Sequence, residues 1–456
     1  MQETNVTIVH GTHELMAQVA EAVNKRKLVT VRTIDALDPI EGKDLIEVAT
    51  IEGWKVVVKK GEFKIGDPCV YFEIDSFLPD GNPAWQFLVD KSSRTFEGQK
   101  GHKLRTIKMG GQVSQGLALP LRAVEYVDLI VNGQPEYETF DDTMGAVIAS
   151  ICEQQKHLAI RDIDFSALLG VKKYETPLPA ELAGQAEGLF PFFMQKTDQE
   201  RCQNLKAQIF GYEDVRVPFD VTLIPQEARD VMSAKGELVQ LENGSHVKVL
   251  KATASPDDVY EITMKLDGSS MTAFGRLVNS RVEGVATMVY EDGVCSRNLQ
   301  LKINEENASN TFVSTFVNSG LRKAIEAYVL ETGHSIAVQG ELMGPNIQGN
   351  REQFKDFKFF VFDIYDIDQG HYYPPFLRTN VFNRLKELGA NIEHVPVIDP
   401  IVKLGELNLN SIEDLLNFAE GPSIKHPVRE GLVFKRMDGQ FSFKAISNVF
   451  LAKEKD

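Results

Sequence analysis

Lys265-Leu266-Asp267-Gly268-Ser269-Ser270 is the stretch from which the fold of this chain is best inferred. β-runs begin at Tyr260, which puts the lysine where a strand passes into a loop, and Asp, Gly and Ser favour a tight turn there. A lysine amine beside a carboxylate suits a covalent nucleotide carrier if burial or a nearby cation lowers its pKa from about 10.4. Chance produces this pattern in roughly one chain in ten, so the inference depends on the segments downstream.

Length and composition limit the possible classes of protein. A chain of 456 residues with 43% hydrophobic content predicts two or three domains. A net charge of −16 argues against a protein that coats nucleic acid non-specifically, so any nucleic-acid site must be local. Residues 1–27 lack a signal-peptide core, and no apolar run is long enough for a membrane span. Four scattered cysteines signal neither disulfides nor zinc, which together predicts a cytoplasmic protein.

The region from Leu28 to Leu121 consists of short β-branched and aromatic runs between Gly, Pro and Asp. Five such runs predict a small OB-like barrel, a fold that often grips single-stranded nucleic acid, although another small β-barrel fits nearly as well. The five predicted strands are Leu28–Ile34, Leu45–Ile51, Trp54–Lys59, Cys69–Ile74 and Lys103–Lys108. A basic run is a candidate nucleic-acid contact or simply a solvated strand face: Lys100, His102, Lys103, Arg105 and Lys108.

The predicted fold class is α+β, an OB-like barrel followed by a mixed α/β domain that holds the candidate nucleotide-carrying lysine. The predicted divisions are an N-terminal extension (1–27), the barrel (28–122), a connector with an acidic, partly helical stretch (123–195), and the mixed domain (196–456) with an insertion at about 206–258. Thr197 or Asp198 is the expected N-cap of a helix that carries Arg201. Further helices are expected at Ala308–Thr332, Thr379–Leu388 and Ser411–Ala419.

Downstream segments offer phosphate-handling side chains in separate strands. Arg297 follows Ser296, Glu341 follows the strand 336–339, and Glu430 begins a strand that ends at Lys435. Taken alone, each of these residues or strands has a purely structural explanation: Arg297 as a surface guanidinium, Glu341 as a solvated strand end, and the phenylalanine-rich run as a buried sheet strand. Alternation in the last strand puts Lys444 on the face opposite its phenylalanines, where it could meet Lys265.

A neighbouring ammonium group would favour the neutral amine of Lys265. Mg²⁺ held near Asp267 and Glu430 would favour it further, and the same cations would stabilise phosphate oxygens.

Taken together, six collinear motifs resemble those of covalent nucleotidyltransferases, and specifically ATP-dependent RNA ligases of the clade with an N-terminal OB domain, the Deinococcus and Naegleria type. The motifs are Lys265–Ser269, Ser296–Asn298, Gly340–Glu341, Phe360–Ile364, Glu430–Lys435 and Phe443–Lys444. Ile446 departs from the pattern, because the family often has a second lysine there. The long stretch between Arg201 and Lys265 is a second departure.

The resemblance implies a role for each site residue. Lys265 would be the adenylylated nucleophile, with Asp267 and Glu430 holding a hydrated Mg²⁺ or Mn²⁺. Glu341 would hold the ribose, Phe360 or Phe362 would stack on adenine, and Lys435 and Lys444 would bind the α-phosphate. Arg297 would contact AMP or the RNA end, and Arg201 would contact the β- and γ-phosphates or the nucleic acid. Gly268 would form the cofactor-binding turn.

The implied activity is ligation of a 3′-hydroxyl to a 5′-phosphate at nicks in RNA or RNA/DNA duplexes, by a monomer that needs no membrane. A DNA ligase or a GTP-using capping enzyme remains an alternative, although these usually carry their OB domain after the catalytic domain, and only about a dozen residues follow Lys444. A second alternative is a non-catalytic OB protein with a decayed ligase domain.

Overall fold

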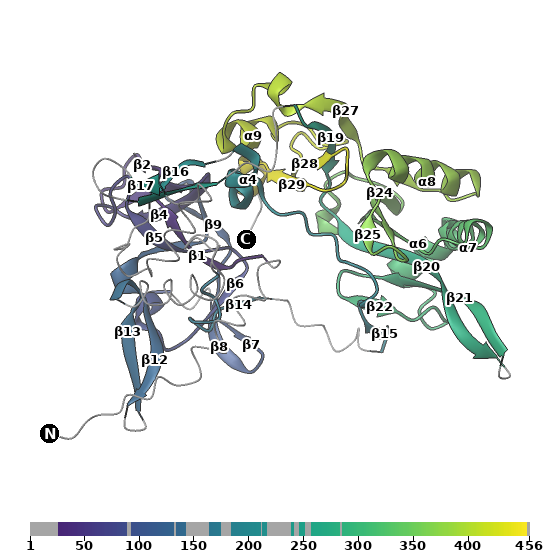
Figure 1. The fold of residues 1–456 in the computed structure, drawn as a ribbon, viewed down its shortest axis with the longest axis horizontal. Helices are drawn as coiled ribbons and strands as arrows, with labels where there is room; N and C mark the ends of the chain where they lie inside the picture. Colours follow the sequence, from purple (N-terminus) through teal and green to yellow (C-terminus); the bar gives the residue numbers. More distant parts are fainter. Residues whose placement is uncertain are drawn as a thin grey trace. The chain divides into compact units, whose positions relative to one another are not determined.

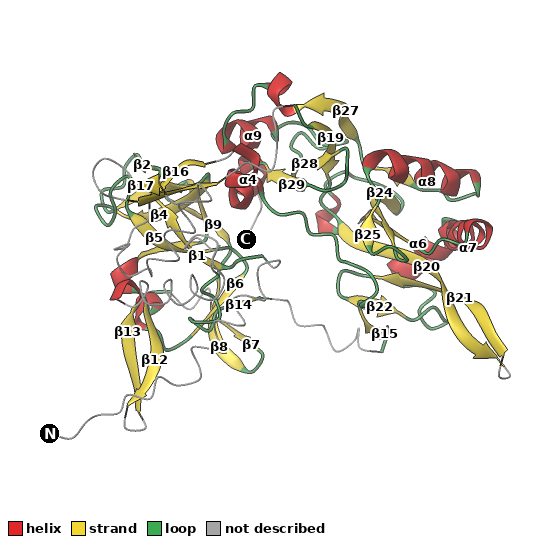
Figure 2. Ribbon diagram, viewed as in Figure 1, coloured by secondary structure: helices red, strands yellow, loops and turns green. Residues whose placement is uncertain are grey.

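The computed structural model describes residues 26–88, 93–131, 134–142, 164–174, 184–210, 212–216, 239–240, 246–250, 257–282 and 285–453. The chain divides into two compact units. Unit 1 comprises Met1–Pro177, Lys206–Thr253 and Glu454–Asp456, and unit 2 comprises Leu178–Leu205 and Ala254–Lys453. Helices and antiparallel sheets occur together, which confirms the α+β class (Figures 1 and 2). Within the described ranges, no helix is long and apolar enough to span a bilayer.

Unit 1 is built from small antiparallel sheets of short strands. Along β4, Trp54, Val56 and Val58 are buried at alternate positions, as expected for a strand with one face on a core. The first sheet has the order β1 (Val29–Thr33), β5 (Pro68–Phe72) and β11 (Leu117–Pro120), and the second has the order β2 (Ala36–Pro39), β3 (Ile46–Ile51) and β4 (Trp54–Lys59). A four-stranded sheet has the order β14 (Lys172–Lys173), β6 (Ser76–Pro79), β8 (Gln99–Lys103) and β7 (Ser93–Phe96). The remaining sheets pair β9 (Thr106–Met109) with β10 (Gln112–Gln115), β12 (Glu125–Val131) with β13 (Gln134–Thr139), and β18 (His246–Leu250) with both β16 (Tyr212–Arg216) and β17 (Val239–Gln240).

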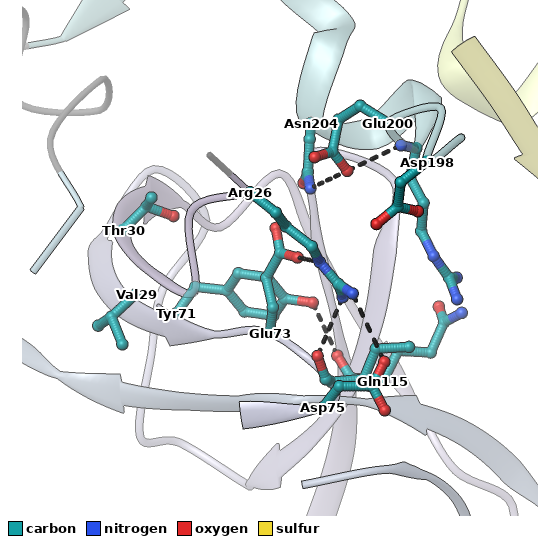
Figure 3. A network of polar contacts seen from close by, with 12 residues as sticks. Arg26, Val29, Thr30, Tyr71, Glu73, Asp75, Gln115, Asp198, Glu200 and Asn204 are labelled. Carbon is teal, nitrogen blue, oxygen red and sulfur yellow. Dashed lines mark hydrogen bonds and ion pairs between the residues drawn. The ribbon is translucent and has the colours of Figure 1, made fainter. Parts of the chain in front are cut away.

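A polar network lies beside the first sheet (Figure 3). Arg26 Nε donates to Glu73 Oε2 at 2.8 Å, and Arg32 Nη2 donates to Glu73 Oε1 at 3.3 Å. Tyr71 Oη donates to the carbonyl of Gln115 at 2.9 Å. Because Glu73 is fully buried, its two guanidinium partners satisfy a charge that would otherwise be costly to bury.

The predicted strand Lys103–Lys108 is wrong in one respect: it is two strands, β8 and β9. The chain changes partners between them, because Leu104 exchanges backbone hydrogen bonds with Ser76 and Asp75. Part of the predicted connector packs in unit 1, where Phe140 and Phe165 join the core and β14 pairs with β6. The N-terminal residues 1–25 and the acidic residues 143–163 lie outside the described residues, and the predicted domain boundaries stay predictions.

Two antiparallel sheets and several helices form unit 2 (Figure 1). The larger sheet has the order β15 (Ala186–Leu189), β22 (Leu299–Leu301), β21 (Val285–Cys295), β20 (Ser269–Val282), β23 (Ile336–Met343), β24 (Lys358–Asp366) and β25 (His371–Tyr372), with β26 (Glu393–His394) parallel to β24. The smaller sheet has the order β27 (Val397–Lys403), β19 (Val259–Lys265), β28 (Gly431–Arg436) and β29 (Ser442–Ile446).

Helices cover one face of the larger sheet and enclose the main core with it. The described residues include the helices α4 (Lys206–Phe210, in unit 1), α6 (Thr311–Asn318), α7 (Leu321–Thr332), α8 (Pro375–Glu387), α9 (Ile412–Phe418) and α10 (Asn448–Lys453). The predicted helix Ala308–Thr332 is two helices, because Gly320 adopts a left-handed φ of 75° between them. Helix α8 begins earlier than predicted, at Pro375, where the missing N–H of a first-turn proline costs nothing.

The prediction of a helix that starts at Thr197 or Asp198 is wrong, because residues 195–200 lie in neither a helix nor a strand. Glu200 O accepts from Lys444 N at 2.8 Å, and Arg201 forms a parallel bridge with Lys444. A 3₁₀ helix begins only at Cys202. Pairing with β29 thus overrides the local capping signal.

Candidate active site

Lys265 is the last residue of β19, where it lies opposite Gly431 at the start of β28. Its Nζ donates to Glu430 Oε2 at 2.8 Å, and the two side chains are 27% and 16% exposed. Strand pairing therefore brings together a lysine and a carboxylate that are 165 residues apart in sequence. The small exposed fraction of the amine leaves it accessible from one side.

The turn after Lys265 is fixed by Glu341 from β23. Gly268 N donates to Glu341 Oε1 at 3.0 Å. A Cβ atom at Gly268 would lie 2.6 Å from Leu342 O and 2.9 Å from Glu341 Cγ, so no larger residue fits without a backbone shift. Asp267 lies within 3.6 Å of Arg351 Nη1. The glycine thus allows the turn to approach the strand that carries Glu341.

Lys435 lies deeper and is held by β24. Its Nζ donates to Phe362 O and to Asp363 Oδ1, both at 2.6 Å, and the Lys435 and Asp363 side chains are 9% and 5% exposed. Asp363 Oδ2 also accepts from Gln199 Nε2 at 3.2 Å. The ammonium group is therefore fixed by a buried ion pair and a carbonyl.

Asp198 joins the other two cations of the site. Its Oδ1 accepts from Lys444 Nζ at 3.1 Å, and its Oδ2 lies 3.5 Å from Arg297 Nη2. Lys444 belongs to β29, and Arg297 to the loop between β21 and β22. A single carboxylate in the segment 195–200 thus bridges one strand and one loop.

These groups surround one pocket. Six predicted site residues line it: Lys265, Arg297, Glu341, Phe362, Lys435 and Lys444. The remaining lining residues are Thr197, Asp198, Gln199, Thr263, Met264, Leu266, Ser270, Val395 and Val433. Five predicted residues lie outside this lining, namely Arg201, Asp267, Gly268, Phe360 and Glu430. Four lysine or arginine side chains and a half-apolar wall suit a ligand with both phosphate and ring.

The two candidate aromatic residues differ in position. Phe360 is 3% exposed and packs against Phe354 with ring centroids 5.8 Å apart, so it belongs to the core. Phe362 is half-buried and lines the pocket. Of the two, only Phe362 is placed to stack on a planar ligand.

The sign of the pKa shift at Lys265 is opposite to the prediction. Burial alone would lower the pKa of this amine, but Glu430, Glu341 and Asp267 together raise it above its ordinary value. Lys444 behaves as expected, because burial lowers its pKa to about 8, Asp198 opposes the shift, and Lys265 and Arg201 add to it. The prediction counted the neighbouring ammonium but underweighted three carboxylates.

The carboxylates of the site also perturb one another. Burial raises the pKa of Glu341 to about 7, with Lys265 opposing the shift and Glu430 adding to it. Burial also raises the pKa of Asp267, and the charge of Glu430 contributes. This repulsion between carboxylates is the kind that a cation relieves.

Within the described ranges, no group of three or more His, Cys, Asp or Glu side chains could hold a metal ion. The donor set of Asp267 and Glu430, two carboxylates whose charges interact, nevertheless fits a hydrated divalent cation. Mg²⁺ in phosphate-handling sites usually keeps several waters and takes one or two protein carboxylates plus substrate oxygens.

Three functional contacts were missed by the sequence analysis. Asp198 carried only a capping signal, and the ion-pair partners Asp363 and Arg351 carried none. Asp363 lies within the motif Phe360–Ile364 but was given no role there, although strand alternation could have assigned it to the face that Lys435 reaches. Arg351 follows the 3₁₀ helix Gln348–Asn350 and offers no periodic signal.

The fold and the pocket define a class of protein: an α+β chain in which a β-rich unit precedes a two-sheet domain with a lysine-centred, phosphate-suited pocket. A model of an OB-fold domain matches residues 28–121, and a model of the RNA ligase family matches residues 258–446. The first match confirms the predicted OB fold. No curated protein sequence matches the chain.

Solved structures of a Naegleria gruberi RNA ligase are similar over nearly the whole chain. A variant with ATP and Mn is 34% identical, with a TM-score of 0.63, and the match covers 94% of this chain and 100% of that one. A variant with AMP and Mn is 34% identical, with a TM-score of 0.63, and the match covers 94% of this chain and 99% of that one. The enzyme with PPi is 35% identical, with the same TM-score and the same two coverages. The chain belongs to the RNA ligase family.

Proposed function

We propose that this protein is an ATP-dependent RNA ligase that seals a 3′-hydroxyl to a 5′-phosphate. In the first step the ammonium of Lys265 gives a proton to solvent, and the neutral Nζ attacks the α-phosphorus of ATP. A P–N bond forms, a second N–H proton passes to solvent, and pyrophosphate leaves with the electron pair of the broken P–O bond. AMP then passes to a 5′-phosphate oxygen, which restores the free amine. Attack by the 3′-hydroxyl finally forms the phosphodiester and releases AMP.

The observation that carries this proposal is the Lys265 side chain in one pocket with Lys435, Lys444 and Arg297. Transfer of a nucleotidyl group depends on positioning and charge neutralisation more than on proton transfer. Lys444 and Arg297 can neutralise the charge on an α-phosphate and a departing pyrophosphate, while Lys435 stays paired with Asp363 and fixes the strand that carries Phe362. The solved complexes of the Naegleria ligase with ATP and with PPi add support for these ligands.

The remaining roles follow from position. Phe362 stacks on adenine, and Glu341 accepts from a ribose hydroxyl, while its other oxygen holds the Gly268 turn. Asp267 and Glu430 would hold a hydrated Mg²⁺ or Mn²⁺, the latter found with the Naegleria ligase. When bound, that cation neutralises phosphate charge near the amine. Arg201, which bridges Lys444 through the backbone, contacts the β- and γ-phosphates or the nucleic acid.

The proposed substrate is a nick in an RNA or RNA/DNA duplex, with RNA at the 3′-hydroxyl end. The OB-fold domain would grip the nucleic acid, as such barrels often do. We also propose that the enzyme acts as a monomer in the cytoplasm, for which the free, buried Cys69, Cys202 and Cys295 are the supporting observation.

The deciding experiment is labelling with α-labelled ATP or GTP in the presence of Mg²⁺, followed by denaturation. The wild type should carry label from ATP, and both Lys265→Ala and Lys265→Arg should lose it, since the arginine keeps the charge but cannot act as the nucleophile. Label that survives in Lys265→Ala would refute the assignment. Label from GTP alone would indicate capping chemistry, and no label would indicate a nucleic-acid-binding protein with a decayed ligase domain.

Nicked duplexes that differ only at the 3′-terminal nucleotide test the substrate. Faster sealing of a ribose than of a deoxyribose 3′-hydroxyl end supports an RNA ligase. Equal rates, or faster sealing of the deoxyribose end, would favour a DNA ligase.

A further inference from the structure

A short aromatic segment leads from β15 toward the pocket in the chain direction. Residues 190–196, called here the aromatic segment, contain Phe190, Phe192, Phe193 and Lys196. The side chain of Phe192 is 98% exposed, the highest value among the exposed large hydrophobic residues described. The segment continues directly into Thr197, Asp198 and Gln199, which line the pocket.

The exposure of Phe192 is imposed by anchors on both sides. Pro191 and Met194 are buried, and Met194 N donates to Pro191 O at 3.3 Å, so Phe192 occupies a tight turn. The neighbouring Phe193 packs edge-on against Phe274 with centroids 5.2 Å apart, and the Arg276 guanidinium covers its ring at 3.8 Å. The anchors on both sides thus hold the Phe192 ring in solvent, where a planar ligand can reach it.

Cations lie against the rings on either side of Phe192 in the chain, and one of them connects the segment to the pocket. Lys196 Nζ lies 5.7 Å from the Phe190 ring and donates to Asn298 Oδ1 at 3.0 Å. The backbone of Phe190 also donates to Asn298 O at 2.8 Å. Asn298 follows Arg297, which lines the pocket and is 51% exposed. The aromatic segment and the pocket are therefore joined through one loop.

We propose that the aromatic segment is a stacking platform for an unpaired nucleotide of an RNA end whose terminal phosphate enters the pocket. Proteins hold single-stranded nucleic acid with bases on exposed aromatic faces and the backbone along lysine and arginine. The cores of protein–protein interfaces, by contrast, are depleted in lysine. The inference deepens the proposed ligase function and rests on it, because it gives the ligase a site for a nucleotide that is unpaired beside the nick.

The test is fluorescence anisotropy of full-length protein with a labelled, 5′-phosphorylated single-stranded RNA and with a blunt RNA duplex of equal length, without ATP or divalent metal. Phe192→Ala should weaken single-strand binding by about 5- to 100-fold, the usual loss of one stacked base. Phe192→Trp should restore it. The matched control is Phe376→Ala, which removes another exposed phenylalanine, 66% exposed on α8, and should change nothing.

Lys196→Gln gives an independent readout of the cation. If Lys196 contacts one phosphate, the slope of log K against log salt should become less steep by about 0.7 for a single strand. An unchanged slope would contradict a backbone contact at this position.

Several outcomes would overturn the platform: single-strand affinity equal to wild type in Phe192→Ala, equal losses on the blunt duplex, or no single-strand binding by the wild type. A changed sedimentation coefficient with unchanged RNA affinity would show that a protein surface covers the ring, and would also overturn it. The labelling experiment separates this result from the proposed function. Absence of label from ATP refutes the ligase, whereas a selective loss in Phe192→Ala still identifies an RNA site.

Discussion

Lys444 provides a direct test of the pocket's electrostatics through pH. Burial is the main cause that lowers its pKa to about 8, and Lys265 and Arg201 add to the shift against the opposing charge of Asp198. An ordinary lysine, with a pKa of about 10.4, stays charged up to pH 9.5. A loss of phosphate affinity between pH 8 and 9.5 would therefore report this buried site.

The magnitude follows from the fraction of Lys444 that is charged. If only the ammonium form binds phosphate, affinity is retained below the lowered pKa and is lost as pH rises above it. With a pKa of about 8, half the lysine is charged at pH 8 and roughly 3% at pH 9.5, so affinity should fall by about 15-fold, or about 1.6 kcal/mol. Glu341, with a pKa raised to about 7, is mostly ionised across this range and contributes little.

Isothermal titration calorimetry with an ATP analogue bridged by methylene between the α- and β-phosphates measures binding without chemistry. The matched control is Lys444→Arg, because arginine keeps its charge throughout this pH range. Wild-type affinity should decline with pH, and Lys444→Arg affinity should stay nearly constant. A flat wild-type profile, or the same decline in Lys444→Arg, would refute the assignment of Lys444 to phosphate.

Three further predictions concern the core and the turn. Glu261→Ala should lower the free energy of unfolding by about 3–5 kcal/mol in a denaturant titration, because it leaves Arg378 buried without the carboxylate that accepts from its Nη2 at 2.6 and 2.7 Å. The double variant Glu261→Leu with Arg378→Met should lose less stability. An equal loss in the double variant would argue against an electrostatic cause. Phe362→Ala should raise the KM for ATP about tenfold, because Phe362 lines the pocket. Phe360→Ala should instead destabilise the fold by about 3–5 kcal/mol, because Phe360 is buried in the core. The reverse pattern would show that Phe360, not Phe362, contacts ATP. Gly268→Ala should slow formation of the lysyl-AMP adduct about 100-fold in a single-turnover assay, because its Cβ would lie 2.6 Å from a backbone oxygen and displace the turn. A wild-type rate would show that the turn tolerates the shift.

The strand positions of the lysines were the most predictable part of the site. Lys265 and Lys435 follow apolar runs near the ends of β19 and β28, and alternation along β29 assigns Lys444, in the middle of that strand, to one face. The contact between Lys265 and Glu430 needed only the assumption that their strands pair, which β19 and β28 do. Local patterns were sufficient here because antiparallel pairing brings strand ends together.

Asp198 could not be predicted because its role arises from tertiary pairing. Thr and Asp before an acidic run favour a helix N-cap, and that local preference was followed in the prediction. The backbone bond from Lys444 to Glu200, together with the two cations that Asp198 contacts, holds the segment against β29 instead. Lys444 is 246 residues from Asp198, so no local window contains this information.

The burial of each ion pair in the pocket determines which lysine or arginine a phosphate can bind in place of its carboxylate partner. Lys435 and Asp363 are 9% and 5% exposed and 2.6 Å apart, so separating them would leave two charges buried without partners. Lys444 and Asp198 are 18% and 37% exposed and 3.1 Å apart, and Asp198 already divides its charge between Lys444 and Arg297. Water can solvate Asp198 once it is released, whereas it cannot reach Asp363 as easily. An incoming phosphate should therefore replace Asp198 at Lys444 and Arg297, while Lys435 stays paired and acts by fixing the strand that carries Phe362.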